Sequence, residues 1–353
     1  MSKQKETLIL FSIILIGFCL RLFLVLDLPI WLDEAFTINH IKLSFLELIN
    51  GQSDPTHPFG YYLFLKFWSV FSSNLQWLRM STLIFYLVNS ILLYKIALVA
   101  KQKNLAYFLV ILYALSGYFL IFDWQTRMYA GVLTLMLTSW YFLQKRKNLL
   151  FMLANAIGLY FDYAFLWYLI PLTVFIFYQL ITKHEQVKQF ALGTIFSWLA
   201  FAFWIPTFLL TYKNGIEAIS WSSRFTNPIF FLPYFLGSHV NAFITVLFFV
   251  FSLIGIFVSF QNDKRFAKFF IGAGFVSGLL AFITSFFVGS IFHVRNLQIM
   301  ALMFLIALAV CLDWLWKQKH QYLVLIFLSI YFFNFLLTMQ IHYVFPSSLL
   351  LKF

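Results

Sequence analysis

Charged residues are scarce in this chain of 353 residues, where Asp, Glu, Lys and Arg together make up 10%. Soluble domains carry about a quarter of their residues as charges, because their surfaces must be covered with polar groups. The low charge, with 63% hydrophobic and 22% aromatic residues, therefore excludes a soluble enzyme and a disordered chain. Only two cysteines are present, Cys19 and Cys311, and both lie within apolar runs, which argues against a disulfide or metal framework.

The chain also lacks the short motifs that mark several enzyme classes. It has no Gly-x-Ser-x-Gly elbow, no Walker loop and no His and Cys spacing typical of zinc sites. Gly272, Gly274 and Gly278 lie inside an apolar run without a preceding strand, which favours close helix packing over dinucleotide binding. The net charge of +12 would indicate nucleic acid for a soluble protein. In a membrane protein, basic loops report topology instead, so we expect no nucleic-acid partner.

Apolar runs of about 20 residues, the length that crosses the hydrocarbon of a bilayer, are what the sequence has in abundance. They predict an all-α, polytopic bundle of transmembrane helices that forms a single membrane domain over residues 1–353. The run over Leu149–Phe161 is too short to cross without residues from its ends. The first run reads as an uncleaved anchor, since no small-x-small cleavage site follows it. The eleven predicted spans are Thr7–Asp27, Leu78–Ala100, Leu105–Phe122, Met128–Leu143, Leu149–Phe161, Tyr163–Thr182, Phe190–Tyr212, Tyr234–Phe260, Phe266–Gly289, Val294–Trp316 and Tyr322–His342.

The distribution of Lys and Arg among the short loops predicts the orientation of the chain. Alternate loops are basic, and they begin at Lys101, Lys145, Lys183, Lys264 and Lys317. We expect these loops and the N-terminus to be cytoplasmic and the C-terminus to be outside. The opposite side then collects most of the acids, namely Asp27, Asp33, Glu34, Glu47, Asp54, Asp123, Asp162 and Glu217. The expected location is the bacterial plasma membrane, with any chemistry on its outer face.

Two predicted outer loops are long enough to carry that chemistry, over residues 28–77 and 213–233. Adjacent carboxylates in the first loop, Asp33 and Glu34, would point about 100° apart on a helix, so one can face a substrate while the other orients a backbone group or an arginine. The alternative is that Asp33 caps a short interfacial helix that starts at Glu34.

A second polar group in the same loop combines Asp54 and His57 at a spacing of three residues. The following segment, from Tyr61 to Val70, is apolar and aromatic, and it predicts a helix that lies along the membrane surface. Pro58 suits the first turn of this helix. His57 is either a hydrogen-bonded structural residue or, together with Asp54, a candidate functional residue.

A third polar group follows the third predicted span and contains Asp123, Gln125, Arg127 and Tyr129. Arg127 at the start of a helix opposes the helix dipole, so a phosphate or carboxylate partner would favour it there. The alternative is an arginine that reaches the lipid headgroups. Three further residues lie on the same predicted side, namely Arg79, Asp162 and Arg295.

Taken in order, these segments resemble the membrane glycosyltransferases of the GT-C fold. The likeness is to the dolichyl-phosphate-mannose protein mannosyltransferase superfamily with its bacterial lipid A aminoarabinose transferase relatives. It covers the first half of the chain well and the second half through topology and Arg295. The matching segments are Asp33-Glu34, His57-Pro58-Phe-Gly-Tyr61-Tyr62, Arg79-Met-Ser81, Trp124-Gln125-Thr-Arg127-Met128-Tyr129 and Arg295-Asn296.

The resemblance implies transfer of a sugar from a polyprenyl-phosphate donor to an acceptor hydroxyl, with inversion at the anomeric carbon. It implies that Asp33 is the base and that Glu34 assists or holds the loop. Arg127, Arg295 and Arg79 are then expected to bind the donor phosphate, whose charge either arginines or a divalent metal can stabilise. The residues expected to contact substrate are Asp54, His57, Tyr61, Asp123, Gln125, Tyr129 and Asp162.

Two departures from the family pattern leave the acceptor and the use of metal open. Gln125 stands where relatives have Glu, and Asp162 stands where many have His. The long soluble C-terminal domain of many relatives is missing, so the expected acceptor is a lipid-linked glycan or surface polymer, with a protein also open. The expected partners are this donor, the acceptor and membrane lipids.

A transporter or lipid flippase is the main alternative, and a non-catalytic assembly subunit is a third. Transporters place charges near the bilayer midplane, and the mid-span charges here are Arg21 and Lys95. Because we expect no acidic partner for either at the same depth, the sequence favours the transferase.

Overall fold

The computed structural model describes residues 3–50, 54, 56–183, 185–219, 228–261, 265–288 and 291–344. Every regular element in these ranges is a helix, which confirms the all-α prediction for them. The α-helices are α1 (Lys3–Asp27), α2 (Leu32–His40), α3 (Phe45–Asn50), α4 (Gly60–Trp68), α5 (Leu75–Val99), α6 (Lys103–Ala114), α7 (Gly117–Asp123), α8 (Tyr129–Gln144), α9 (Asn148–Phe161), α10 (Leu166–Lys183), α11 (Glu185–Ala202), α12 (Ile205–Ile219), α13 (Leu232–Phe235), α14 (Ala242–Gln261), α15 (Arg265–Val288), α16 (Gln298–Lys317) and α17 (Gln321–Val344). Two short 3₁₀ helices are η1 (Tyr163–Phe165) and η2 (Pro228–Phe231).

Within the described ranges, seven helices are long and apolar enough to cross a membrane, and two bent pairs raise this number to nine. The chain is therefore a multi-pass membrane protein. The seven are α1, α5, α10 with η1, α14, α15, α16 and α17. The count of eleven spans and the orientation stay predictions, because α8 and α9 are shorter than a bilayer requires.

Three predicted spans are interrupted where local chemistry breaks the helix. Leu105–Phe122 is divided into α6 and α7, which meet at 59°, and the Ser116 hydroxyl accepts from the Phe119 N–H as α7 begins. Phe190–Tyr212 is divided into α11 and α12 at 46°, and Pro206 in the first turn of α12 has no N–H to continue the ladder. The predicted helix from Tyr234 instead turns at Gly237, whose φ of +66° is in the left-handed region, before α14 begins.

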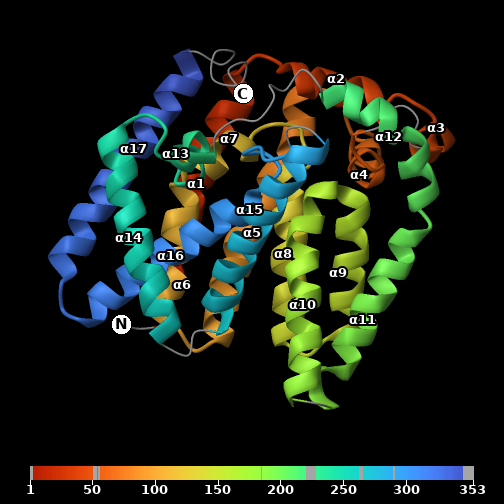
Figure 1. Ribbon diagram of the computed structural model, residues 1–353. Coiled ribbons are helices and arrows are strands. Elements are labelled where there is room, and N and C mark those ends of the chain that lie inside the picture. Colours follow the sequence, from red (N-terminus) through yellow and green to blue (C-terminus); the bar gives the residue numbers. More distant parts are fainter. Residues whose placement is uncertain are drawn as a thin grey trace.

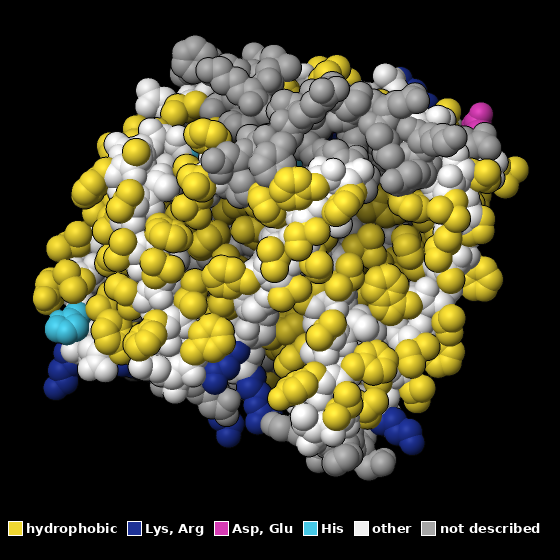
Figure 2. Space-filling model, in the orientation of Figure 1, with side chains coloured by type: hydrophobic (Ala, Val, Ile, Leu, Met, Phe, Trp, Pro, Cys, Tyr) yellow, Lys and Arg dark blue, Asp and Glu magenta, His cyan; other side chains and the backbone are white. Residues whose placement is uncertain are grey.

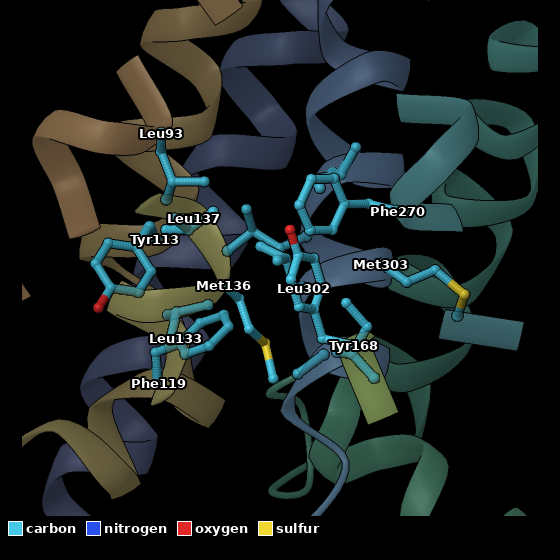
Figure 3. Packing of buried hydrophobic residues seen from close by; sticks show 14 of the residues in the cluster. Leu93, Tyr113, Phe119, Leu133, Met136, Leu137, Tyr168, Phe270, Leu302 and Met303 are labelled. Atoms are coloured by element: carbon cyan, nitrogen blue, oxygen red, sulfur yellow. The ribbon is translucent and has the colours of Figure 1, made fainter. Parts of the chain in front are cut away.

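Helix α16 lies at the centre of the bundle and packs against α6, α14 and α15 (Figure 1). Most of its side chains are buried, unlike those of the other candidate spans. Figure 3 shows Leu302 and Met303 of this helix among side chains from α8, α10 and α15, including Met136, Tyr168 and Phe270. Because α16 has little contact with lipid, its neighbours determine where its N-terminal end and the preceding turn lie.

The two ends of the bundle differ in character. Figure 1 places α2, α3 and α4 together at one end, near α12 and the top of α9. In Figure 2, hydrophobic side chains cover the flank, and most of the visible Lys and Arg side chains gather at the opposite end. The first predicted loop, residues 28–77, contains α2, α3 and α4, whereas residues 220–227 of the second predicted loop, 213–233, lie outside the described residues.

Candidate functional site

The predicted outer residues form a charged cluster at the end of the bundle that carries α2. Five segments that are distant in sequence supply it: α2, the turn before α4, the link between α7 and α8, the turn between α9 and η1, and the turn before α16. We call this group of side chains the outer cluster, and define it as Asp33, Thr37, His57, Arg127, Asp162 and Arg295.

Asp33 and Glu34 point in different directions, as adjacent helical residues should. The Oδ2 atom of Asp33 lies 3.1 Å from Nη1 of Arg295, and the side chains of both residues are about a third exposed, at 31% and 27%. The pair joins residues that are 262 positions apart. Water reaches the side chain of Asp33, whereas Glu34 is buried. Of these two carboxylates, Asp33 is therefore the one that a substrate can approach.

Glu34 is fully buried and organises the backbone around it. Its carboxylate accepts from Nε and Nη2 of Arg79, at 2.8 and 2.6 Å, and from the backbone N–H of Thr126 at 2.8 Å. It also accepts from the N–H of Trp31 at 3.1 Å, as the third residue of α2. The helix therefore begins at Leu32, so the alternative in which Asp33 caps a helix starting at Glu34 is wrong. Glu34 caps the helix instead, because its carboxylate accepts from the backbone N–H of Trp31, the residue before α2.

Arg79, at the start of α5, has its guanidinium enclosed by protein. Besides the two contacts to Glu34, it donates to the carbonyls of Val25, Leu28 and Pro29 at 3.1, 2.7 and 2.8 Å. The indole of Trp124 lies 4.8 Å from its central carbon. All five N–H groups of a guanidinium thus have protein acceptors, and Arg79 joins the end of α1 to α2.

Arg127 is almost fully buried and lies beside Asp33. Its Nη1 donates to the Thr37 hydroxyl at 2.8 Å and lies 3.4 Å from the backbone carbonyl of Asp33. Its Nη2 lies 3.1 Å from Nε2 of His57. Its Nε has no hydrogen-bond partner among the described residues, which leaves one buried donor available. Since α8 begins at Tyr129, Arg127 precedes the helix as predicted.

His57 contacts the carboxylate of Asp162, a residue that the sequence did not link to it. Its Nδ1 lies 2.9 Å from Oδ2 of Asp162, although the contact does not have the alignment of a regular hydrogen bond. Asp162 caps η1 with its other oxygen, which accepts from the Ala164 N–H at 2.6 Å. The turn between α9 and η1 therefore positions an acid against the imidazole.

Asp54 forms its own network with side chains of the same loop. Its carboxylate accepts from the N–H and hydroxyl of Thr56, at 2.8 and 2.6 Å, and from the hydroxyl of Tyr62. Burial alone would raise the pKa of this carboxyl, but the nearby imidazole of His57 and these hydrogen bonds outweigh burial and hold its pKa below the usual value. Asp54 is thus an ionised, buried anchor for the turn that presents His57.

Asp123 is directed away from the outer cluster. Its Oδ2 lies 3.0 Å from Nε of Arg21 in α1, and both side chains are buried. The expectation that Arg21 has no acidic partner is therefore wrong. The bend between α6 and α7 turns the end of α7 toward α1, a displacement that a straight predicted span did not allow.

The remaining predicted contact residues are buried beside the cluster. The amide of Gln125 donates to the Ile121 carbonyl at 2.9 Å, and the ring of Tyr129 lies 6.0 Å from the central carbon of Arg127. Tyr61 packs edge-on against Phe161, and burial raises the pKa of its hydroxyl well above the usual value. Of the cluster, Thr37 had no role assigned from sequence, although its spacing of three from Glu34 places it on the same face of α2.

In the part of the chain that the structure describes, no group of three His, Cys, Asp or Glu side chains could hold a metal ion. The predicted acids are each directed to an arginine, a histidine or a hydroxyl.

Comparison with known sequences gives the chain no relative, since no family model and no curated protein matches it.

Proposed function

We propose that the protein is a GT-C-type glycosyltransferase that moves a sugar from a polyprenyl-phosphate donor to an acceptor hydroxyl on the outer membrane face. The observation that carries this proposal is the pairing of a solvent-accessible carboxylate, Asp33, with Arg295 while Arg127 lies against the same turn of α2. A base next to two cations is what inverting transfer from a phosphate requires.

In the proposed reaction, the acceptor oxygen forms a bond to the anomeric carbon while the bond from that carbon to the phosphate oxygen breaks. Asp33 takes the proton of the acceptor hydroxyl. The phosphate departs with the bonding electron pair, and the guanidinium groups of Arg127 and Arg295 stabilise its added negative charge. Since Arg295 contacts Asp33 directly, a phosphate that attracts Arg295 also leaves Asp33 free to act as base.

Four of the other expected residues bind protein groups through their side chains, namely Glu34, Arg79, Asp123 and Gln125. The proposal therefore gives them the role of holding the reacting residues in place. Arg79 is accordingly not one of the proposed phosphate ligands. The acceptor remains a lipid-linked glycan, a surface polymer or a protein.

The first test is transfer activity in membranes that contain the Asp33→Asn variant and a lipid-phosphate sugar. Loss of a general base costs about 10²- to 10⁴-fold in rate, so we expect at least a hundred-fold loss of kcat with normal amounts of folded protein. Asp27→Asn is the matched control, because Asp27 is an exposed acid at the end of α1, and it should transfer normally. Full activity in the Asp33→Asn variant would refute the assignment of the base.

A lipid analysis of cells that lack the protein separates the transferase from the flippase. A transferase defect should leave the unused polyprenyl-phosphate sugar in the membrane. If that lipid does not accumulate on the outer leaflet, a transporter or flippase becomes the better account, and the buried pair of Arg21 and Asp123 becomes its first candidate site.

A further inference from the structure

The imidazole of His57 connects three segments that the sequence keeps far apart. His57 lies just before α4, Arg127 lies just before α8, and Asp162 lies between α9 and η1. Nε2 of the imidazole is 3.1 Å from Nη2 of Arg127, and Nδ1 is 2.9 Å from Oδ2 of Asp162. The side chain of His57 is mostly buried, with 19% exposed. Its two nitrogens therefore face a permanent cation and a carboxylate.

The chemistry of the two neighbours determines which nitrogen carries the proton. A guanidinium has N–H donors and no acceptor, so Nε2 can bind Arg127 only through an unprotonated lone pair. A neutral imidazole then has its proton on Nδ1, where it faces the carboxylate of Asp162. If the ring became doubly protonated, its Nε2–H would point at the Arg127 N–H, and the contact would be lost.

We infer that His57 is a positioning residue that acts in the neutral form with its proton on Nδ1 and holds Arg127 against α2. The carboxylate of Asp162 lies beside Nδ1 and favours the proton there, the ring accepts from Nη2, and Nη1 is left to bind Thr37 beside Asp33. The orientation of Arg127 is then determined at two nitrogens, and its buried Nε has no partner among the described residues. That His57 affects catalysis rests on the proposed function, in which Arg127 contacts the donor phosphate.

Charged and titratable groups surround the ring from every element packed against it. Arg127 is the cation beside the ring, and Asp162 and Asp54 are the acids. His40 of α2 also lies within electrostatic range of His57. Burial lowers the pKa of His40, Asp54 acts to raise it, and Arg127 and His57 act to lower it.

Three variants test this inference through the donor. His57→Gln provides an amide oxygen that can accept from Arg127, so kcat/KM should stay near the wild-type value. His57→Leu removes the acceptor and should lower kcat/KM about ten- to a hundred-fold, the range for hydrogen bonds to a charged group. His320→Gln is the control, because His320 is exposed just before α17, and it should leave kcat/KM unchanged.

A spectroscopic test does not depend on any activity. With ¹⁵N-labelled histidine, the resonance that disappears in the His57→Gln variant should show protonated Nδ1 and unprotonated Nε2 near neutral pH. A proton on Nε2, or an imidazolium at that pH, would overturn the inference. So would a His57→Leu variant with wild-type kcat/KM for the donor. Failure of every lipid-phosphate sugar as a substrate would refute the proposed function while leaving the tautomer result intact.

Discussion

The buried pair of Arg21 and Asp123 provides the sharpest prediction for the stability of the bundle. Arg21 donates to Asp123 at 3.0 Å and to the carbonyls of Ala114 and Tyr113 at 2.8 and 3.2 Å. These carbonyls lie where α6 ends, so the guanidinium binds backbone acceptors at the end of a broken helix. The ring of Tyr86 lies 4.2 Å from its central carbon. The perturbation is Arg21→Met, which keeps an unbranched apolar side chain and removes every donor.

The magnitude follows from what the substitution leaves behind. Hydrogen bonds between membrane helices contribute about 0.6 kcal/mol each, so the three contacts to other segments account for about 2 kcal/mol. Asp123 would also remain as a buried carboxylate, with only the Tyr113 hydroxyl as a partner at 3.2 Å. Removal of one member of a buried ion pair costs about 3–5 kcal/mol. We expect Arg21→Met to lower the free energy of unfolding by about 3 kcal/mol or more.

The two cysteines allow a direct assay of this loss. Cys311 is fully buried in α16, whereas Cys19 is exposed. In a Cys19→Ala background, reaction of the Cys311 thiol with a probe therefore reports unfolding in mixed detergent micelles. Lys95→Met is the matched control, because Lys95 is the other cation that the sequence places within a span, and its side chain is exposed. The control should change stability by no more than about 0.5 kcal/mol.

A double-mutant cycle separates the ion pair from general damage. If the pair is real, Arg21→Met with Asp123→Asn should cost less than the sum of the two single changes, by about 0.5–3 kcal/mol. The reasoning would be refuted if the two changes were additive, or if Arg21→Met were no more harmful than Lys95→Met.

Two further predictions concern helix packing and acid stability. A Cβ added at Gly255 would lie 1.8 Å from the backbone oxygen of Ala307, whereas one added at Gly272 meets no atom within 4 Å. In the Cys311 assay, Gly255→Ala should therefore lose at least about 1–3 kcal/mol through overpacking of α14 against α16, and Gly272→Ala should lose none; equal effects would contradict this packing. For Asp54, burial acts to raise the pKa, but His57 and the hydrogen bonds outweigh it, so the folded pKa lies below the unfolded value. Its stabilisation is present above the unfolded pKa and is lost as pH falls through the folded pKa. The Asp54→Asn variant should thus lose less stability than the wild type between about pH 5 and pH 3, and a parallel decline would argue against an ionised Asp54.

Residues close together in sequence were the part of the site that could be predicted. Asp33 and Glu34 must diverge on any helix, and the structure shows one partly exposed and the other buried. The position of Arg127 just before a helix could also be predicted, because the apolar run that forms α8 follows it directly in the sequence. The contact of His57 with Asp162 could not be predicted, because the two residues lie far apart in the sequence and meet only through the packing of α4 against α9.

The sequence by itself determined that the chain spans a membrane as helices, because long apolar runs in lipid must satisfy their backbone hydrogen bonds internally. Tertiary structure alone decided which charges meet. Asp33 finds Arg295 across 262 positions, and Arg21 finds Asp123 because α6 and α7 bend by 59°. Lipid is as apolar as the helices, so hydrophobicity does not select neighbours among them. Close packing, as of α14 on α16, and buried polar contacts make that selection, and both depend on residues from many segments at once.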